Sequence, residues 1–160
     1  MQNITLTLYC FEELTDQAKQ KAIYDNYHYN VSDNDWYQYI YEDANNVGLE
    51  INSFNLYRKN IHIECRNLEY TASKIVEYFN KESIIYKESL MFINDMRNLD
   101  YDFDHEEIED KEYDYKNDLD TFYLQLLDME YDYLTQESTV IEILNSLGNV
   151  FLKDGSIFNN

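Results

Sequence analysis

The amino-acid sequence predicts a single α+β domain over residues 1–160, in which a small antiparallel β-sheet packs against several helices. Two kinds of periodicity lead to this fold class. Apolar residues alternate with polar ones in two short stretches, which is typical of strands with one buried face. Elsewhere apolar residues recur every three or four positions, which is typical of amphipathic helices. The longest helical pattern lies in an acidic segment of about residues 100–133, so a long acidic helix is expected in the C-terminal half.

The first three elements are predicted from alternation and from capping residues. Residues 3–11 alternate apolar and polar side chains, which predicts a half-buried strand. Thr15 is a favourable N-cap residue and predicts a helix that ends near residue 28. After a polar loop, Asp33 or Asp35 is expected to cap a second helix.

The middle of the chain predicts a hairpin followed by two helices. Gly48 is expected to end the second helix, because glycine readily adopts the left-handed conformation found after a helix C-terminus. Residues 49–57 and 60–66 then predict two antiparallel strands. Thr71 is expected to cap a third helix, and a fourth helix is expected over about residues 86–98.

The acidic segment itself predicts a helix. Between Asp100 and Asp120 the sequence holds 11 acidic and two basic side chains. From Ile108 onward, apolar residues recur at helical spacing, which predicts one helix over residues 105–133 with one buried stripe. The stripe consists of Ile108, Tyr115, Leu119, Phe122, Leu126, Met129 and Tyr133.

The C-terminal residues predict one more helix and a hairpin. Ser138 or Thr139 is expected to start the helix, and Gly148 is expected to end it. The dipeptide Asp154-Gly155 lies between two short apolar stretches, and this arrangement is a common signal for a tight β-turn. These two short strands are expected to join the same small sheet as residues 3–11, 49–57 and 60–66.

The net charge of −20 is concentrated in the C-terminal part of the chain. Residues 88–160 hold 19 acidic and four basic side chains. Such dense negative charge repels phosphates and anionic lipids, so we expect neither direct nucleic-acid binding nor membrane binding. The charge favours a basic protein as the partner, and a role in solubility alone is the alternative.

Four acidic residues are predicted to share one helix face, because Glu106, Asp110, Asp114 and Asp118 follow at intervals of four. Each step between like charges costs a helix about 0.2–0.5 kcal/mol. Two ion pairs that the spacing predicts, Glu107–Lys111 and Glu112–Lys116, offset part of this cost. We expect the acids to pair with Lys and Arg of a partner, and the tyrosines to add contact area. The predicted partner-binding residues are Asp100, Asp102, Asp104, Glu106, Asp110, Tyr113, Asp114, Tyr115 and Asp118.

The sequence predicts no catalytic site, no cofactor and no metal site. Asp100, Asp102 and Asp104 are spaced like the first ligands of an EF-hand calcium loop, but His105 and Lys111 stand where that loop needs glycine and glutamate. The three histidines have no second ligand at a metal-binding spacing. Carboxylate-based or metal-dependent catalysis therefore stays only an alternative to a non-enzymatic role.

The two ends of the chain carry a resemblance to a known group of proteins. The block YCFEELTDQAKQKAI, the helix DWYQYIYEDANNVGLEI and the ending FLKDGSIF resemble small acidic proteins of phages and prophages. The resemblance covers residues 8–51 and 151–158. It implies a phage-encoded protein that acts in the cytoplasm of a host bacterium, which agrees with a sequence that has no apolar run of 18 residues.

In size and charge the chain also resembles phage anti-defence proteins, which include anti-restriction DNA mimics and anti-CRISPR proteins. This resemblance implies an inhibitor that binds a basic bacterial defence nuclease, either a CRISPR effector or a restriction enzyme. For an RNA-guided CRISPR nuclease, it implies a block of DNA binding or of nuclease-domain activation. The alternatives are a non-inhibitory phage structural or regulatory protein and an anti-restriction DNA mimic.

Overall fold

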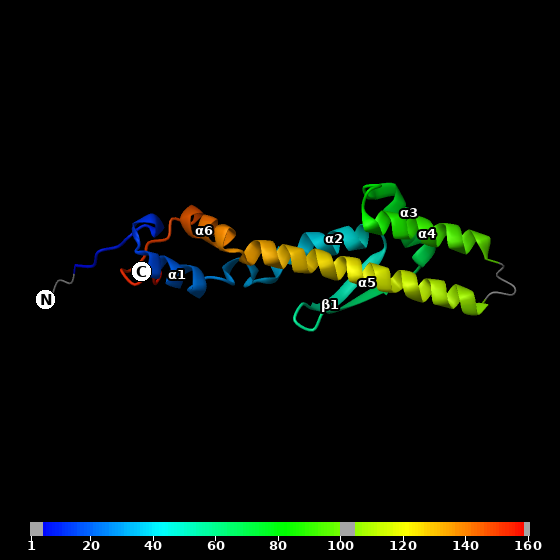
Figure 1. Ribbon diagram of the computed structural model, residues 1–160, viewed down its shortest axis with the longest axis horizontal. Helices are drawn as coiled ribbons and strands as arrows, with labels where there is room; N and C mark the ends of the chain where they lie inside the picture. Colours follow the sequence, from blue (N-terminus) through cyan, green and yellow to red (C-terminus); the bar gives the residue numbers. More distant parts are fainter. Residues whose placement is uncertain (1–4, 100–104, 159–160) are drawn as a thin grey trace. The chain divides into compact units, whose positions relative to one another are not determined.

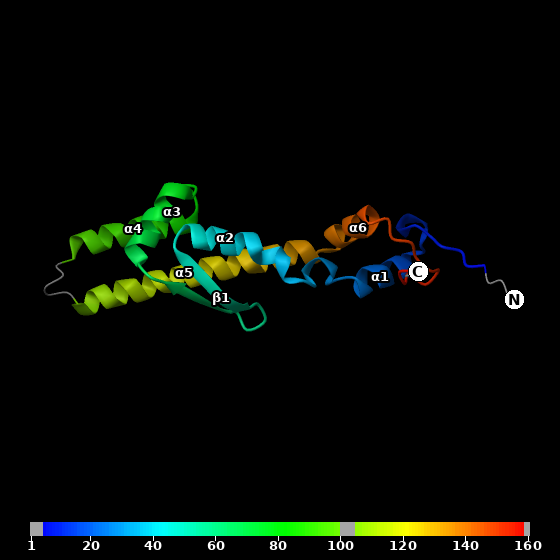
Figure 2. The same ribbon diagram turned by 180° about the vertical axis from the view of Figure 1, so that it is seen from behind.

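The structure, a computed structural model, describes residues 5–99 and 105–158. Within these residues the chain forms six α-helices and one two-stranded antiparallel sheet, so the predicted α+β class is confirmed (Figures 1 and 2). The elements are α1 (Asp16–Asp25), α2 (Gln38–Asn46), β1 (Leu49–Asn55), β2 (Asn60–Cys65), α3 (Leu68–Tyr78), α4 (Ile84–Asn98), α5 (His105–Thr135) and α6 (Glu137–Ser146). Three short 3₁₀ helices lie at Phe11–Glu13, Tyr29–Val31 and Asn34–Tyr37.

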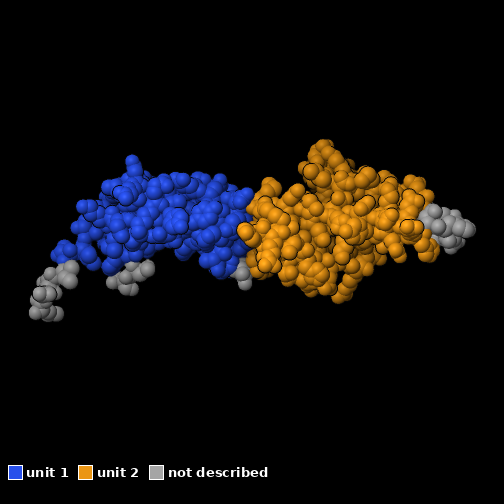
Figure 3. Space-filling view, turned by 60° about the horizontal axis from the view of Figure 1, so that its bottom comes forward, with its two compact units in different colours: residues 1–36, 130–160 blue, residues 37–129 orange. Residues whose placement is uncertain are grey.

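The chain divides into two compact units, each with its own buried side chains (Figure 3). Unit 1 consists of residues 1–36 and 130–160, and unit 2 consists of residues 37–129. Helix α5 contributes residues to both units, since it runs without a break from His105 to Thr135.

Unit 1 packs the N-terminal residues against the C-terminal ones. Its core joins side chains of α1 and α6 to Phe11 and Phe151, whose rings meet edge to face at 6.0 Å. The strand predicted over residues 3–11 is wrong over its described part, because only Tyr9 pairs, in a single bridge to Phe151. Phe151 forms a second single bridge to Ile157, so the C-terminal hairpin is reduced to one bridge and a turn.

Capping explains where the helices of unit 1 begin and end. The prediction for Thr15 is confirmed, since its hydroxyl accepts a hydrogen bond of 3.3 Å from the amide of Ala18. Helix α1 ends earlier than predicted, where the side chain of Asn26 donates to the carbonyl of Ala22. Helix α6 begins after Gln136, ahead of the predicted caps Ser138 and Thr139, and Gly148 follows it with a φ of 63°.

Unit 2 contains the hairpin that the sequence predicted. Strands β1 and β2 pair antiparallel from Leu49 opposite Cys65 to Asn55 opposite Asn60, with one irregularity between Ile51 and Ser53. Leu49, Ile51 and Ile63 are buried, which follows the alternation in the sequence. The two strands form a sheet of their own in unit 2, so the prediction that residues 3–11 and the C-terminal hairpin join this sheet is wrong within the described residues.

The helices of unit 2 differ from prediction mainly at their starts. Helix α2 follows a 3₁₀ turn and its N-cap is Tyr37, so neither Asp33 nor Asp35 caps it. Helix α3 is capped by Asn67, while Thr71 is fully buried inside the helix. Helix α4 is capped by Ser83. Gly48 follows α2 with a φ of 86°, as the sequence predicted.

The long acidic helix is confirmed as α5, but its buried stripe is only half correct. Tyr115 and Leu119 are buried as predicted, and the stripe then continues through Tyr123 and Leu127. The predicted Met129 is 68% exposed. Steps of four residues turn the stripe by about 40° each time, because a helix has about 3.6 residues per turn. The stripe therefore winds around α5, since successive parts of the helix pack against different neighbours.

Candidate partner-binding surface

The acidic row predicted from the sequence lies on the exposed side of α5. Glu106, Asp110, Asp114 and Asp118 are all exposed, and the unbroken helix gives them a regular spacing of about 6 Å along its axis. Each step also turns the row by about 40° around the helix. Its last two members therefore come closest to α4, which runs beside α5 in the opposite direction (Figures 1 and 2).

Helix α4 adds two carboxylates to this surface, and the sequence analysis did not predict them. Glu88 and Asp95 line a small cavity of about 80 Å³ together with Asp114 and Asp118 of α5. The side chain of Met91, which also lines this cavity, is 55% exposed. We call the six acids the acidic face; its members are Glu88, Asp95, Glu106, Asp110, Asp114 and Asp118.

A signal for the α4 contribution was present in the sequence. Glu88 and Asp95 are seven residues apart, so they share one side of a helix, and Met91 lies between them on the same side. Two acids at this spacing are common on any solvated helix. The spacing indicates a shared surface only once the fold shows that this side of α4 lies next to the acidic row of α5.

A lysine holds the two helices together where the acids are densest. The Nζ of Lys111 lies 2.8 Å from a carboxylate oxygen of Asp95, so the predicted pairing of Lys111 with Glu107 is replaced by a pairing across the two helices. The hydrogen bond to Asp95 raises the pKa of the Lys111 ammonium, so this amine is charged at neutral pH. One positive charge therefore lies among several negative ones in the acidic face.

Tyr115 is part of the core, as its place in the apolar stripe predicted, so its assignment to the partner-binding residues was wrong. Its side chain is only 2% exposed. Its hydroxyl is 2.7 Å from the hydroxyl of the buried Ser89, and its ring stacks on Phe92 at 4.3 Å between centroids. Burial raises the pKa of the Tyr115 hydroxyl, so it is a neutral hydrogen-bonding group. Tyr115 therefore fixes α5 against α4 and positions the acids around it.

The other predicted contact residues stand differently. Tyr113 is 67% exposed on α5, where helical spacing places it beside Asp110. Asp100, Asp102 and Asp104, which are spaced like the first ligands of an EF-hand loop, lie outside the described residues. Of the predicted partner-binding residues that the structure describes, the acidic row and Tyr113 are therefore exposed.

Asp118, at the α4 side of the row, lies in an environment that disfavours its charge. Partial burial raises the pKa of Asp118, and the neighbouring charge of Asp114 raises it further. Both effects disfavour the ionised form of Asp118. A cation placed beside Asp114 and Asp118 would relieve this repulsion, so the geometry favours positively charged groups at this end of the acidic face.

Charge is strongly segregated within unit 2. Residues 37–87, which form α2, the hairpin and α3, hold seven acidic and six basic side chains, a net charge of −1. Residues 88–129, which form most of α4 and α5, hold 14 acidic and three basic side chains, a net charge of −11. Nearly all the negative charge of unit 2 therefore belongs to residues 88–129, and 11 of their 14 acids lie in the helices that carry the acidic face.

Comparisons with protein-family models, with curated proteins and with solved structures give no match to this chain. Within residues 5–99 and 105–158, no group of three or more His, Cys, Asp or Glu side chains is arranged to hold a metal ion. None of the helices in these ranges is both long and apolar enough to cross a bilayer.

Proposed function

We propose that this chain is a phage-encoded anti-defence protein that inhibits a basic bacterial nuclease by direct binding in the host cytoplasm. The target that we propose is an RNA-guided CRISPR nuclease. One observation carries this proposal: residues 88–129 of unit 2, which include most of α4 and α5, hold a net charge of −11, while the rest of that unit is nearly neutral. The role is non-enzymatic and needs no cofactor.

The charge distribution supports binding rather than solubility alone. Solubility needs only a net charge, and it is served equally well by acids spread over the whole surface. Clustered like charges cost stability through repulsion. At Asp118, burial is the larger cause of the raised pKa, and the charge of Asp114 adds to it. A basic groove that normally holds a nucleic-acid backbone would offset this cost and would attract the acidic face over a distance of about 10 Å.

Two inhibitory mechanisms fit an acidic face of this kind. In the first, the carboxylates occupy the positively charged channel of the nuclease and exclude DNA. In the second, they hold a nuclease domain away from its active position while DNA still binds. The row from Glu106 to Asp118 spans about 18 Å along α5, which matches about five phosphates of one DNA strand in length but has fewer charges. The lower density favours the second mechanism over close mimicry of DNA.

The proposal is tested by reversing two charges of the acidic face. Asp110→Lys combined with Asp114→Lys is expected to lower inhibition of target-DNA cleavage at least about 100-fold, because two attractions become repulsions. The readout is the inhibitor concentration that halves cleavage in a panel of purified CRISPR nucleases and restriction enzymes. Circular dichroism and the unfolding midpoint confirm that the variant is folded.

A matched control carries the same change in net charge elsewhere. Asp132 and Glu142 are both exposed in unit 1, so Asp132→Lys with Glu142→Lys also changes the net charge by four. This variant is expected to inhibit like the parent. Equal inhibition by the parent and the Asp110/Asp114 variant, or equal loss in both variants, would exclude the acidic face as the specific binding surface. A gel shift of the inhibited nuclease with target DNA then separates the two mechanisms.

A further inference from the structure

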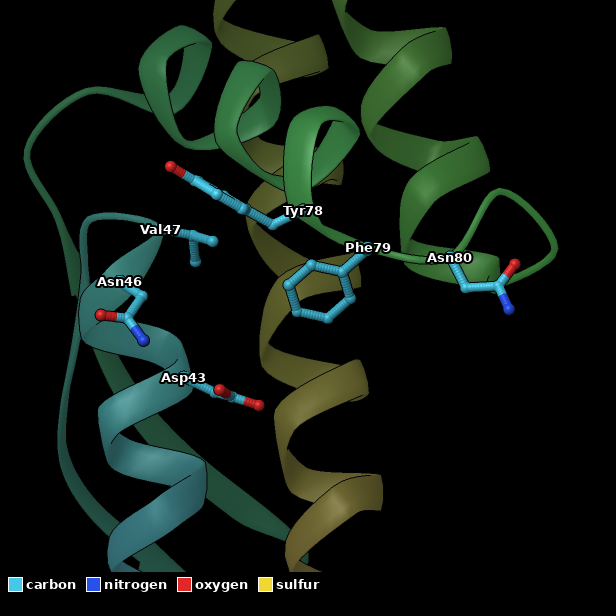
Figure 4. A pocket seen from close by; sticks show the side chains of 6 residues that line it. All are labelled: Asp43, Asn46, Val47, Tyr78, Phe79 and Asn80. Carbon is cyan, nitrogen blue, oxygen red and sulfur yellow. The ribbon is translucent and has the colours of Figure 1, made fainter.

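A cavity among the described residues of unit 2 lies at the ends of two helices and shares no lining residue with the acidic face. It has a volume of about 560 Å³ and is lined by Asp43, Asn46, Val47, Tyr78, Phe79 and Asn80 (Figure 4). The first three lie at the C-terminal end of α2, and the last three lie at and just beyond the C-terminal end of α3. We call this cavity the α2–α3 pocket.

The electrostatics of the pocket favour a cation. Helix C-termini carry partial negative charge from their unpaired carbonyl groups, and two such ends meet at this pocket. The last turns of α2 and α3 both lie within the described residues and contain no basic side chain to offset this charge. The carboxylate of Asp43 adds a full negative charge, and it forms no ion pair with the side chains of residues 5–99 and 105–158.

The aromatic walls of the pocket favour a flat or alkyl-substituted cation over a bare metal ion. In Figure 4 the ring of Phe79 and the carboxylate of Asp43 point toward each other across the pocket, while the side chain of Asn80 points away. An edge contact with Phe122 of α5 at 5.9 Å holds the Phe79 ring in place. Rings of this kind attract cations through their faces, and arginine stacks on them especially well.

A contact beside the pocket shows that one of its rings already packs against a cation. The ammonium of Lys74 lies 5.1 Å from the centre of the Tyr78 ring, and it also lies 2.8 Å from a carboxylate oxygen of Glu77. A ring and a carboxylate that share one cation are the arrangement expected for a cation between Phe79 and Asp43.

We propose that the α2–α3 pocket binds a guanidinium group on an apolar stem, with Asp43 as its counter-ion, Asn46 as a hydrogen-bonding side chain and Phe79 as the stacking surface. A guanidinium fits because it is planar, permanently charged and weakly hydrated, and because it pairs with a carboxylate through two hydrogen bonds. The group can come from an arginine of a peptide or from a small guanidine compound. This inference does not depend on the nuclease proposal, since the two surfaces share no residue.

The test is an NMR titration of the full chain with three matched probes. Nα-acetyl-arginine amide is expected to cause saturable shifts at the backbone amides of Asn46, Val47 and Phe79. Nα-acetyl-citrulline amide, which has the same shape without the charge, is expected to bind at least about tenfold more weakly. A short peptide, Gly-Arg-Gly, separates the sources: tighter binding than the amide indicates a peptide arginine, and equal binding indicates a small guanidine compound.

Matched variants separate the pocket from the general acidity of the chain. Asp43→Asn is expected to lower arginine affinity at least about tenfold, whereas Glu42→Gln, an exposed neighbour outside the pocket, is expected to leave it unchanged. The variant with Asp110→Lys and Asp114→Lys is expected to keep arginine binding. Shifts that are equally large at residues 106–118, or an affinity that Asp43→Asn leaves unchanged, would overturn the inference.

Discussion

Asp120 is a carboxylate in an unfavourable environment on α5. Its Oδ1 atom is buried without a hydrogen-bond partner among the described residues. Partial burial raises the pKa of Asp120 above the ordinary value of 3.8, although the nearby charges of Lys116 and His62 lower it in part. The folded state therefore opposes the ionised form. At neutral pH this carboxylate destabilises unit 2, and protonation relieves the cost.

We expect Asp120→Asn to be more stable than the parent at pH 7, by up to about 1 kcal/mol, because the amide removes the buried charge. Since the folded state binds the proton more tightly than the unfolded state, the parent gains stability as the pH falls through the raised pKa of Asp120. The advantage of the variant should therefore shrink toward zero at pH values below 3.8. Urea unfolding of both proteins between pH 3.5 and pH 7 measures this difference.

The exposed Asp110 supplies the control for this prediction. Asp110→Asn makes the same change in net charge on the same helix, but its carboxylate is in water. Its effect on the free energy of unfolding is expected to stay within about 0.5 kcal/mol. A gain for Asp120→Asn that is constant from pH 3.5 to pH 7 would contradict the assignment of the cost to the ionised carboxylate.

A buried polar contact joins helices α4 and α5 beside the stacked rings of Phe92 and Tyr115. The hydroxyls of Ser89 and Tyr115 are 2.7 Å apart, and both residues are buried. Replacing one partner leaves the other hydroxyl buried without this bond, whereas replacing both removes the need for it. The contact therefore gives the two helices a definite register, and this register determines which acids come together in the acidic face.

We expect Tyr115→Phe to lower the free energy of unfolding by about 1–3 kcal/mol, because Ser89 loses its hydroxyl partner. Combining it with Ser89→Ala should recover part of the loss, so the two effects are not additive. Tyr113→Phe removes a hydroxyl two residues away on the exposed side and should change stability by less than about 0.5 kcal/mol. Urea unfolding of the four variants provides the measurement. Additive effects of the two buried changes would mean that the hydroxyls do not interact.

The sequence predicted elements well where the information is local. The length of α5 and the acidic row follow from spacing along one helix, and the β1–β2 hairpin follows from alternation and its short connection. The prediction of a strand over residues 3–11 was wrong because alternation shows which side chains share a face, but it does not show whether a neighbouring strand is present to pair with. Only Phe151, distant in sequence, pairs with it in the described residues.

The candidate surface was predictable only in part for the same reason. The exposure of Asp110 and Asp114 follows from their place opposite the apolar stripe of α5. The contact of Tyr115 with Ser89, and the ion pair of Lys111 with Asp95, depend on which side of α4 meets α5. That choice is made by tertiary packing, which a single sequence does not reveal. The α2–α3 pocket likewise exists only because two helix ends meet.

At the scale of the whole molecule, repulsion between acids adds to the conformational entropy that folding must overcome. A net charge of −20 on 160 residues opposes compaction, and it is greatest where α4 and α5 lie side by side. The contacts described between these helices, from the Ser89–Tyr115 hydroxyls to the Lys111–Asp95 pair, act against this repulsion. Stability should therefore respond to ionic strength in a direction opposite to binding of a basic partner.

We expect the unfolding temperature of the parent to rise by several degrees between 0.1 M and 1 M NaCl. Over this range the screening length falls from about 10 Å to about 3 Å, so repulsion between acids on neighbouring turns is weakened. Salt also strengthens apolar burial, which would raise stability without any role for charge. The variant with Asp110→Lys and Asp114→Lys separates the two causes, because it buries the same apolar side chains with four fewer net negative charges. Its rise with salt should be clearly smaller than that of the parent, whereas equal rises would show that repulsion within the acidic face does not limit stability.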